Sequence, residues 1–237
     1  MHNSTKTEKR PRGRPRAYDA TEAVASATQA FWQGGYSGTS LDDLSVATGM
    51  NRPSLYGAFG DKHALYLDTL DGYIDAGLKA MEAALGGDLP LAQALMRVYD
   101  TALAIYLPAG AEPRGCFLIG TAVVEAKRDA DVRAKLADGL RTFDGALERR
   151  LLRAQAQGEL DPAADAAVLA RVASAIMHSL ALRSRAGDTR ATLRATAAAG
   201  VALICVAAAP APAPTPTPTP TAPSMEPPKR RRKSAPE

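Results

Sequence analysis

Apolar side chains recur at intervals of three and four residues through most of the chain, and no stretch shows the period of two that marks a half-buried strand. This spacing is typical of amphipathic helices. Asp19 and Glu22 form a capping-box pattern that predicts the start of the first helix, and Gly34-Gly35 predicts its end. The inner face of this helix comprises Val24, Ala27 and Phe31.

The next segment predicts two short helices, over residues 41–48 and 52–59, joined by a turn at 49–51. Each helix follows a residue that can accept hydrogen bonds from the free N–H groups of a first turn, and each ends at a glycine. The caps are Thr39-Ser40 and Asn51, and the stops are Gly49 and Gly60. The side chains expected to hold the pair together are Leu41, Leu44, Ala47, Met50, Leu55 and Phe59.

Asp61 predicts the start of a long fourth helix, and five turns divide the remainder into five more helical stretches. The turns lie at 86–90, 108–113, 129–131, 158–162 and 187–188. A stripe at four-residue spacing marks the penultimate helix, through Val168, Val172, Ile176 and Leu180. We therefore predict an all-α protein, with a three-helix head at 17–61 and a larger helical body at 62–209.

Charge is distributed unevenly along the chain. The net charge is +4, but residues 1–16 carry six Lys or Arg against one Glu, and residues 225–237 carry five against two. The body between them is therefore acidic. Basic arms on an acidic globule suit an anionic polymer better than a small acidic substrate. We expect both the arm at 1–16 and the proline-rich, basic tail at 210–237 to be disordered.

Composition also indicates the compartment. Two cysteines are too few for a disulfide framework, which favours a reducing environment. The N-terminus has no apolar core of a signal peptide, and the most apolar run, at 195–209, is shorter than the roughly 20 residues that a membrane span needs. We expect a soluble cytoplasmic protein, associated with the nucleoid and without a membrane partner.

Two short helices joined by a glycine-containing turn are typical of a helix-turn-helix, whose second helix enters the major groove of DNA. Arg52 is placed to form the bidentate contact to guanine that such helices favour. Side chains with hydroxyl or ammonium groups suited to phosphate oxygens are Thr39, Ser40, Tyr56 and Lys62. The outward face expected on the second helix comprises Arg52, Pro53, Ser54, Tyr56 and Gly57.

Three segments resemble the N-terminal signature of the TetR/AcrR family of repressors: GYSGTSL at 35–41, ATGMN at 47–51 and LYGAFGDKHAL at 55–65. The resemblance implies an all-α homodimer with a DNA-binding head and a ligand-binding, dimerising body. It implies phosphate contacts from Thr39, Tyr56 and Lys62, and base contacts from Arg52 and Ser54; Asn51 belongs to the same expected surface. It also implies a four-helix dimer interface built from residues 162–186 and 189–208. The proline-rich basic tail departs from the family pattern.

The N-terminal arm contains Pro11-Arg12-Gly13-Arg14-Pro15, which is similar to an AT-hook core. Its glycine lets an extended backbone enter a narrow minor groove, where Arg12, Arg14 and Arg16 meet the strong negative potential of A·T-rich DNA. The alternative is a basic arm that adds non-specific phosphate contacts. The run Lys229–Lys233 is either a second DNA tether or a solvated tail.

Candidate chemistry in the body is sparse. Cys116 follows Arg114-Gly115 at a predicted helix start, which permits a reactive thiol, although an inert cysteine lining a pocket is favoured. The residues considered for an effector pocket are Tyr99, Tyr106, Cys116 and Phe117. Cys205 is expected to be packed, and His178 to lie at the dimer interface. No motif indicates a cofactor, a metal site or a catalytic set, so we predict no enzymatic activity.

The sequence therefore predicts a ligand-responsive repressor that binds a palindromic operator as a homodimer and is released by a small molecule. Two alternatives remain open. One is a nucleoid-architectural protein whose arm and tail bind A·T-rich DNA broadly. The other is a sensor of oxidants or electrophiles that acts through Cys116. The sequence specifies neither the effector nor the operator, and it does not separate repression from activation.

Overall fold

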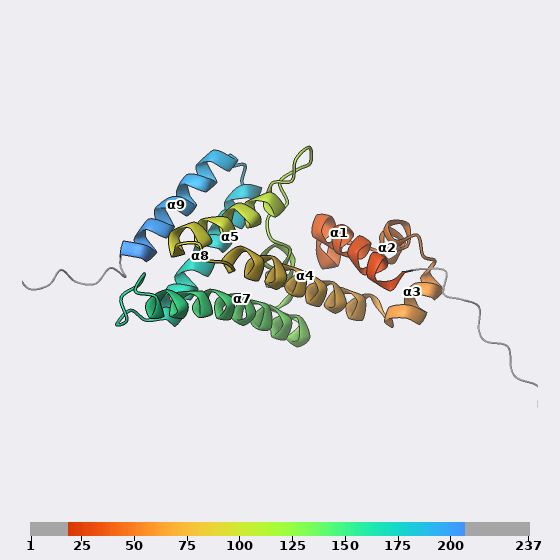
Figure 1. Cartoon of the computed structure of the whole chain (residues 1–237). Coiled ribbons are helices and arrows are strands. Elements are labelled where there is room, and N and C mark those ends of the chain that lie inside the picture. Colours follow the sequence, from red (N-terminus) through yellow and green to blue (C-terminus); the bar gives the residue numbers. More distant parts are fainter. Residues whose placement is uncertain (1–18, 207–237) are drawn as a thin grey trace, which may run out of the picture.

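The computed structural model describes residues 19–206, and every regular element within that range is helical (Figure 1). The elements are α1 (Ala20–Gly38), α2 (Leu41–Thr48), α3 (Arg52–Phe59), α4 (Lys62–Leu85), α5 (Leu91–Tyr106), the π-helical turn η1 (Leu118–Ala122), α6 (Val123–Glu125), α7 (Ala130–Ala156), α8 (Ala166–Arg185) and α9 (Arg190–Val206). The all-α prediction is confirmed, as are all five downstream turns. The predictions for the basic arm and the proline-rich tail lie outside the described residues.

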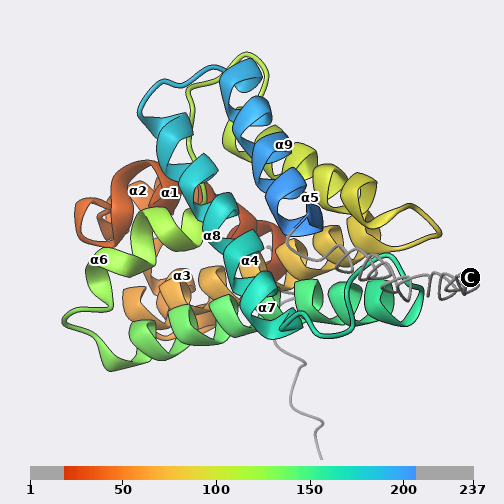
Figure 2. The ribbon, with the colours of Figure 1, turned by 90° about the vertical axis from the view of Figure 1, so that its left-hand side faces the viewer.

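Helices α1, α2 and α3 form a head at one end of the molecule, and the long helix α4 leads from it into the body (Figure 1). Within the body α4 packs against α5 and α7, while its first half packs against α1. Helices α8 and α9 lie side by side on the face turned away from the head (Figure 2). Because α4 packs against helices of both the head and the body, it connects the two directly.

Side-chain caps start most helices where the sequence predicts them. Asp19 accepts hydrogen bonds from the N–H groups of Thr21 and Glu22, Asn51 from Ser54, and Asp61 from Ala64. Ser40 and Asp43 form a complete capping box, in which each side chain bonds the other residue's N–H group. Local chemistry therefore fixes the ends of the three head helices.

The first helix extends further than predicted. Gly35 leaves the helical conformation at φ 69°, as expected, but one more turn follows to Gly38. The hydroxyl of Thr39 donates to the carbonyl of Gly35 at 2.7 Å and so holds this extra turn against the main helix. A Cβ on Gly34 would lie 2.8 Å from that hydroxyl oxygen, so the junction requires a residue without a side chain.

Three expected core positions face outward instead. Ala47 is exposed on α2, and the inner face of this helix is carried by Leu44. Val168 and Val172 remain 47% and 44% exposed, because the buried stripe of α8 runs through small residues. That stripe comprises Ala166, Ala170, Ala173, Met177, Leu180, Ala181 and Ser184. By length and composition α8 is apolar enough to cross a membrane, but here it packs against α7 and α9.

An aromatic cluster joins the head to the body. The Phe117 ring lies 5.5 Å from Trp32 of α1, 6.2 Å from Tyr66 and 5.6 Å from Tyr73 of α4, measured between ring centroids. Trp32 also meets Tyr73 edge-on at 5.3 Å. Phe117 is fully buried, and such pairs stabilise by about 0.5–1.5 kcal/mol beyond burial alone. The junction is therefore a packed contact rather than a loose linker.

The loop that delivers Phe117 to this cluster depends on Gly115. Its φ of 64° lies in the left-handed region, and a Cβ there would stand 2.8 Å from the carbonyl oxygen of Ala181 on α8. Gly110, in the same loop, has a similar φ of 72°, but a Cβ there would meet nothing within 4 Å. The two glycines therefore share a backbone constraint and differ in packing.

We expect Gly115→Ala to lower the free energy of unfolding by about 2–4 kcal/mol, and Gly110→Ala by about 1 kcal/mol, because only the first adds a clash with backbone to the left-handed penalty. Urea denaturation followed by circular dichroism measures both. Equal losses for the two variants would contradict the role assigned to the contact with Ala181.

Candidate nucleic-acid interface and internal cavity

Helix α3 is anchored by one side and exposed on the other. Leu55 is buried in the head with Leu44 and Met50, while Tyr56 is 48% exposed. The remaining residues of the exposed face are Arg52, Pro53 and Gly57. Ser54 is half-buried. The helix therefore presents a polar, aromatic surface that the packing of the head does not use.

Arg52, the first residue of α3, is held by a carboxylate of α2. Its Nε donates to Oδ1 of Asp42 at 2.9 Å, and its second terminal nitrogen lies 2.6 Å from Oδ2. This bidentate pair raises the pKa of Arg52 and leaves both side chains more than half exposed. Exposed pairs of this kind contribute little to stability, so the guanidinium can exchange Asp42 for another planar acceptor.

The expected phosphate contacts fall into two groups. Ser40, Asn51 and Tyr56 are exposed at the ends and surface of the short helices. Thr39 is only 3% exposed, and its hydroxyl donates to backbone carbonyls within the head. This geometry gives Thr39 a structural role in the conformation seen here, and its phosphate contact remains a prediction.

Lys62 is the first residue of α4 and follows α3 closely in the chain. Its Nζ lies 4.4 Å from the centre of the Tyr36 ring, and partial burial lowers the pKa of the ammonium group. The ring thus positions the side chain without neutralising it. Cation–π contacts of this kind are worth about 0.5–1 kcal/mol at exposed sites.

The described head is poor in positive charge. Between residues 19 and 62 the only cations are Arg52 and Lys62, and they face five carboxylates: Asp19, Glu22, Asp42, Asp43 and Asp61. Hydrogen bonds from Ser40 lower the pKa of Asp43, which keeps that carboxylate ionised at neutral pH. The head therefore has groups to read bases but few to attract a polyanion.

The body contains an apolar cavity between α4, α5, η1 and α8. It offers about 50 Å³ to water-sized groups, and one water needs about 10–15 Å³ by such a measure. Its polar lining consists of Tyr73, Thr101, Tyr106, Cys116 and His178. No Asp, Glu, Lys or Arg is among the lining residues described.

Burial keeps the ionisable groups of this cavity neutral. The hydroxyl of Tyr73 lies 3.2 Å from the sulfur of Cys116, and burial raises the pKa of the thiol more than its hydrogen bonds lower it. Burial likewise lowers the pKa of His178, while the charge of Asp144 acts in the opposite direction. The cavity therefore presents hydrogen-bonding groups without a full charge.

Two of the four residues considered for an effector pocket line this cavity, and two do not. Tyr106 and Cys116 are in its wall. Tyr99 instead donates its hydroxyl to the carbonyl of Ala173 at 3.0 Å, and Phe117 faces the aromatic cluster. His178, expected at a dimer interface, also lines the cavity. Sequence reasoning missed the part played by Trp32, for which its being the single tryptophan was the available signal.

Polar contacts at the surface also connect head and body. His63 of α4 lies 2.8 Å from Asp129, which caps α7, and Ser37 donates to Glu125 at 2.9 Å. Asp131 stands close to the first pair. The Asp129 carboxylate already accepts hydrogen bonds from two backbone N–H groups and pairs with His63. We therefore assign no metal to His63, Asp129 and Asp131.

The burial of Cys116 generates a chemical prediction. In the Cys205→Ser variant, we expect the native protein to react with a disulfide reagent at least about 10-fold more slowly than the same chain in denaturant, because a buried thiol with a raised pKa holds little accessible thiolate. Absorbance of the released thiol reports the rate. Equal rates would restore the sensor hypothesis for Cys116.

Comparisons with known proteins follow the same division of the chain. Residues 23–69 match the family described as bacterial regulatory proteins, tetR family, and residues 92–199 match a tetracyclin repressor-like C-terminal domain. The first match runs past the predicted head boundary at residue 61 and into α4.

The HTH-type transcriptional repressor ComR of Escherichia coli is 32% identical over 78% of this chain and 88% of its own length. The repressor BdcR of the same organism is 30% identical over 82% and 93%. Among solved structures, the TetR family regulator CifR, as a cysteine mutant with 26 bp operator DNA, has a TM-score of 0.69 and 28% identity, covering 80% of this chain and 98% of its own. From the helix-turn-helix geometry and these relatives together, the chain belongs to the TetR family and is a DNA-binding transcriptional repressor.

Proposed function

We propose that this repressor binds a palindromic operator as a homodimer and releases it when a small neutral molecule enters the cavity. The observation that carries the proposal is the exposed face of α3, on which Arg52 and Tyr56 have no role in packing. Arg52 and Ser54 read base edges in the major groove. Phosphate contacts come from Ser40, Asn51, Tyr56 and Lys62, with Thr39 joining them only if its hydroxyl leaves the head.

The homodimer is supported by exposed apolar side chains on the two C-terminal helices. Val168, Val172 and Leu182 of α8 and Leu203 of α9 are 44–72% exposed on the face away from the head. A second copy packed on this face would bury them in a four-helix interface. Two recognition helices would then stand about one DNA turn apart, roughly 34–36 Å, and fit successive major grooves.

The N-terminal arm supplies the attraction that the head lacks. Because residues 19–62 carry more carboxylates than cations, most of the electrostatic affinity comes from residues 1–16, including Arg12, Arg14 and Arg16. The arm enters the minor groove beside the operator or contacts phosphates there. Under this proposal the protein acts in the cytoplasm, on the nucleoid.

Release follows a short path from the cavity to the head. Cys116 lines the cavity and the next residue, Phe117, packs on Trp32 of α1 and on two tyrosines of α4. The next element, η1, contributes Leu118 and Ile119 to the cavity wall and is a π-helical turn, a feature that often marks functional sites. A molecule that binds more tightly to a state with a displaced η1 shifts the head, and it weakens DNA binding by its differential affinity for the two states.

The lining of the cavity supports one class of effector. A molecule without net charge is favoured, since an ion would be desolvated with no opposite charge to pair with. The hydroxyls and the imidazole of the wall provide one or two hydrogen bonds. The closed cavity accommodates only a few non-hydrogen atoms, so a larger effector must widen it.

We expect Arg52→Ala to weaken binding to the selected operator by about 1–3 kcal/mol and to relax preference at one base position, because a bidentate base contact is lost. The operator is selected from a random DNA pool with the full chain, and fluorescence anisotropy gives the affinity. Arg141→Ala is the control, since Arg141 is also more than half exposed and ion-paired but lies on α7. Unchanged operator affinity for Arg52→Ala would refute the base contact.

We expect neutral molecules to release the operator and their ionised counterparts to fail, as tested with butanal and benzaldehyde against butyrate and benzoate. Ala102→Phe narrows the cavity and should abolish the response while leaving operator affinity within about two-fold, because Ala102 lies in the wall and far from α3. Release by the carboxylates, or a full response in Ala102→Phe, would contradict the assignment of the cavity.

A further inference from the structure

A second cavity lies between the C-terminal ends of α4 and α7, at the end of α4 opposite the head. It measures about 160 Å³ and has three arginines of α7 in its wall: Arg149, Arg150 and Arg153. The other lining residues are Glu82, Leu85, Gly86 and Ala146. Neither DNA binding nor the apolar cavity involves this site.

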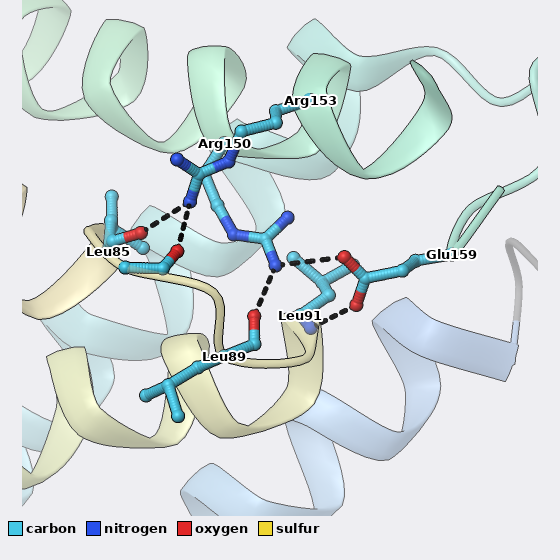
Figure 3. Close-up of polar contacts among 7 residues, drawn as sticks. Leu85, Leu89, Leu91, Arg150, Arg153 and Glu159 are labelled. Atoms are coloured by element: carbon cyan, nitrogen blue, oxygen red, sulfur yellow. Dashed lines mark hydrogen bonds and ion pairs between the residues drawn. The ribbon is translucent and has the colours of Figure 1, made fainter. Parts of the chain in front are cut away.

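Arg150 is the most buried charged side chain of the group. Its side chain is 2% exposed, and one terminal nitrogen donates to the carbonyl of Leu89 at 2.9 Å and to Glu159 at 3.1 Å (Figure 3). The carboxylate of Glu159 also accepts from the N–H group of Leu91. The Nε and the other terminal nitrogen of Arg150 have no hydrogen-bond partner in the described chain. Unpaired buried donors on a cation are costly, which indicates a missing acceptor.

The neighbouring arginines are bonded mainly to neutral groups. Arg153 donates to the carbonyls of Leu85 and Gly87 at the end of α4 (Figure 3). Arg97 of α5 donates to three further carbonyls of the same helix end. Carbonyl oxygens satisfy N–H groups without cancelling charge, and the helix dipole offsets only about half a charge.

Positive charge therefore exceeds negative charge around the cavity. Arg97, Arg149, Arg150 and Arg153 are bonded to only two carboxylates, because Glu82 pairs with Arg149 at 2.9 Å and Glu159 pairs with Arg150. Asp88 lies on the adjoining loop with its side chain exposed. Arg150, which carries the two unpaired buried donors, is among the residues that line a space of this size. The excess of positive charge there matches a compact anion with several oxygen acceptors.

We propose that this cavity binds a tetrahedral oxyanion, either inorganic phosphate or the phosphate of a small monoester. Guanidinium groups present paired N–H donors that match phosphate oxygens. The anion would accept from Arg150 and Arg153 while displacing Glu82 from Arg149. By bridging the ends of α4 and α7, it fixes the helix that also reaches the head.

Isothermal titration calorimetry of the full chain with inorganic phosphate, at constant ionic strength, tests the site. We expect saturable binding of one phosphate per chain that weakens at least 10-fold in Arg149→Gln and in Arg153→Gln. Arg141→Gln is the matched control on the same helix and should leave the isotherm unchanged. Phosphate held by the basic arm or the head would not respond to these substitutions, so the difference isolates the cavity.

A variant that folds poorly would also lose phosphate binding, so a second variant is needed. For Glu82→Gln we expect the opposite change, a gain in phosphate affinity. Removing this carboxylate frees Arg149 and should tighten phosphate binding several-fold. A parallel titration with glycerol 3-phosphate distinguishes a free anion from an ester. Absence of saturable binding to the unmodified chain, or isotherms that Arg149→Gln and Glu82→Gln leave unchanged, would overturn the proposal and leave water as the partner of Arg150.

Discussion

The contact of the Phe117 ring with aromatic side chains of α1 and α4 packs the head directly against the body. Trp32 brings the head to that contact, and Tyr66 and Tyr73 bring the helix that runs through both head and body. Rings packed at this density transmit displacement, because interiors of native density compress little. Phe117 directly follows Cys116 of the cavity wall, so the cavity and the head share this contact.

The head exposes helix α3 through interactions that are local in the chain. Capping side chains and two glycine turns place α3 on the surface, so its orientation depends little on the rest of the protein. Residues 19–62 carry more carboxylates than cations, and Arg52 is paired with Asp42 of α2. Under the proposed function, specific reading and electrostatic attraction are assigned to different segments, which would permit each to be tuned separately.

The body uses burial in two opposite ways. In the apolar cavity it removes charge, because a buried thiol and a buried imidazole are both more stable in their neutral forms. At the distal end of α4 it accommodates charge, because guanidinium groups donate hydrogen bonds to the carbonyls of a helix terminus. The first environment suits a neutral organic molecule and the second suits an oxyanion.

The sequence by itself determined the helices, their caps and turns, the helix-turn-helix and the exposed Arg52, because these follow from interactions between residues a few positions apart. Only the tertiary structure decided that Tyr99 and Phe117 face away from the cavity, that His178 faces into it, and that Ala47 is exposed. Periodicity predicts that a helix has a buried side, but the neighbouring helices decide which residues form it, as Val168 and Val172 show. The burial of Cys116 and Arg150 likewise depends on helices far away in the chain.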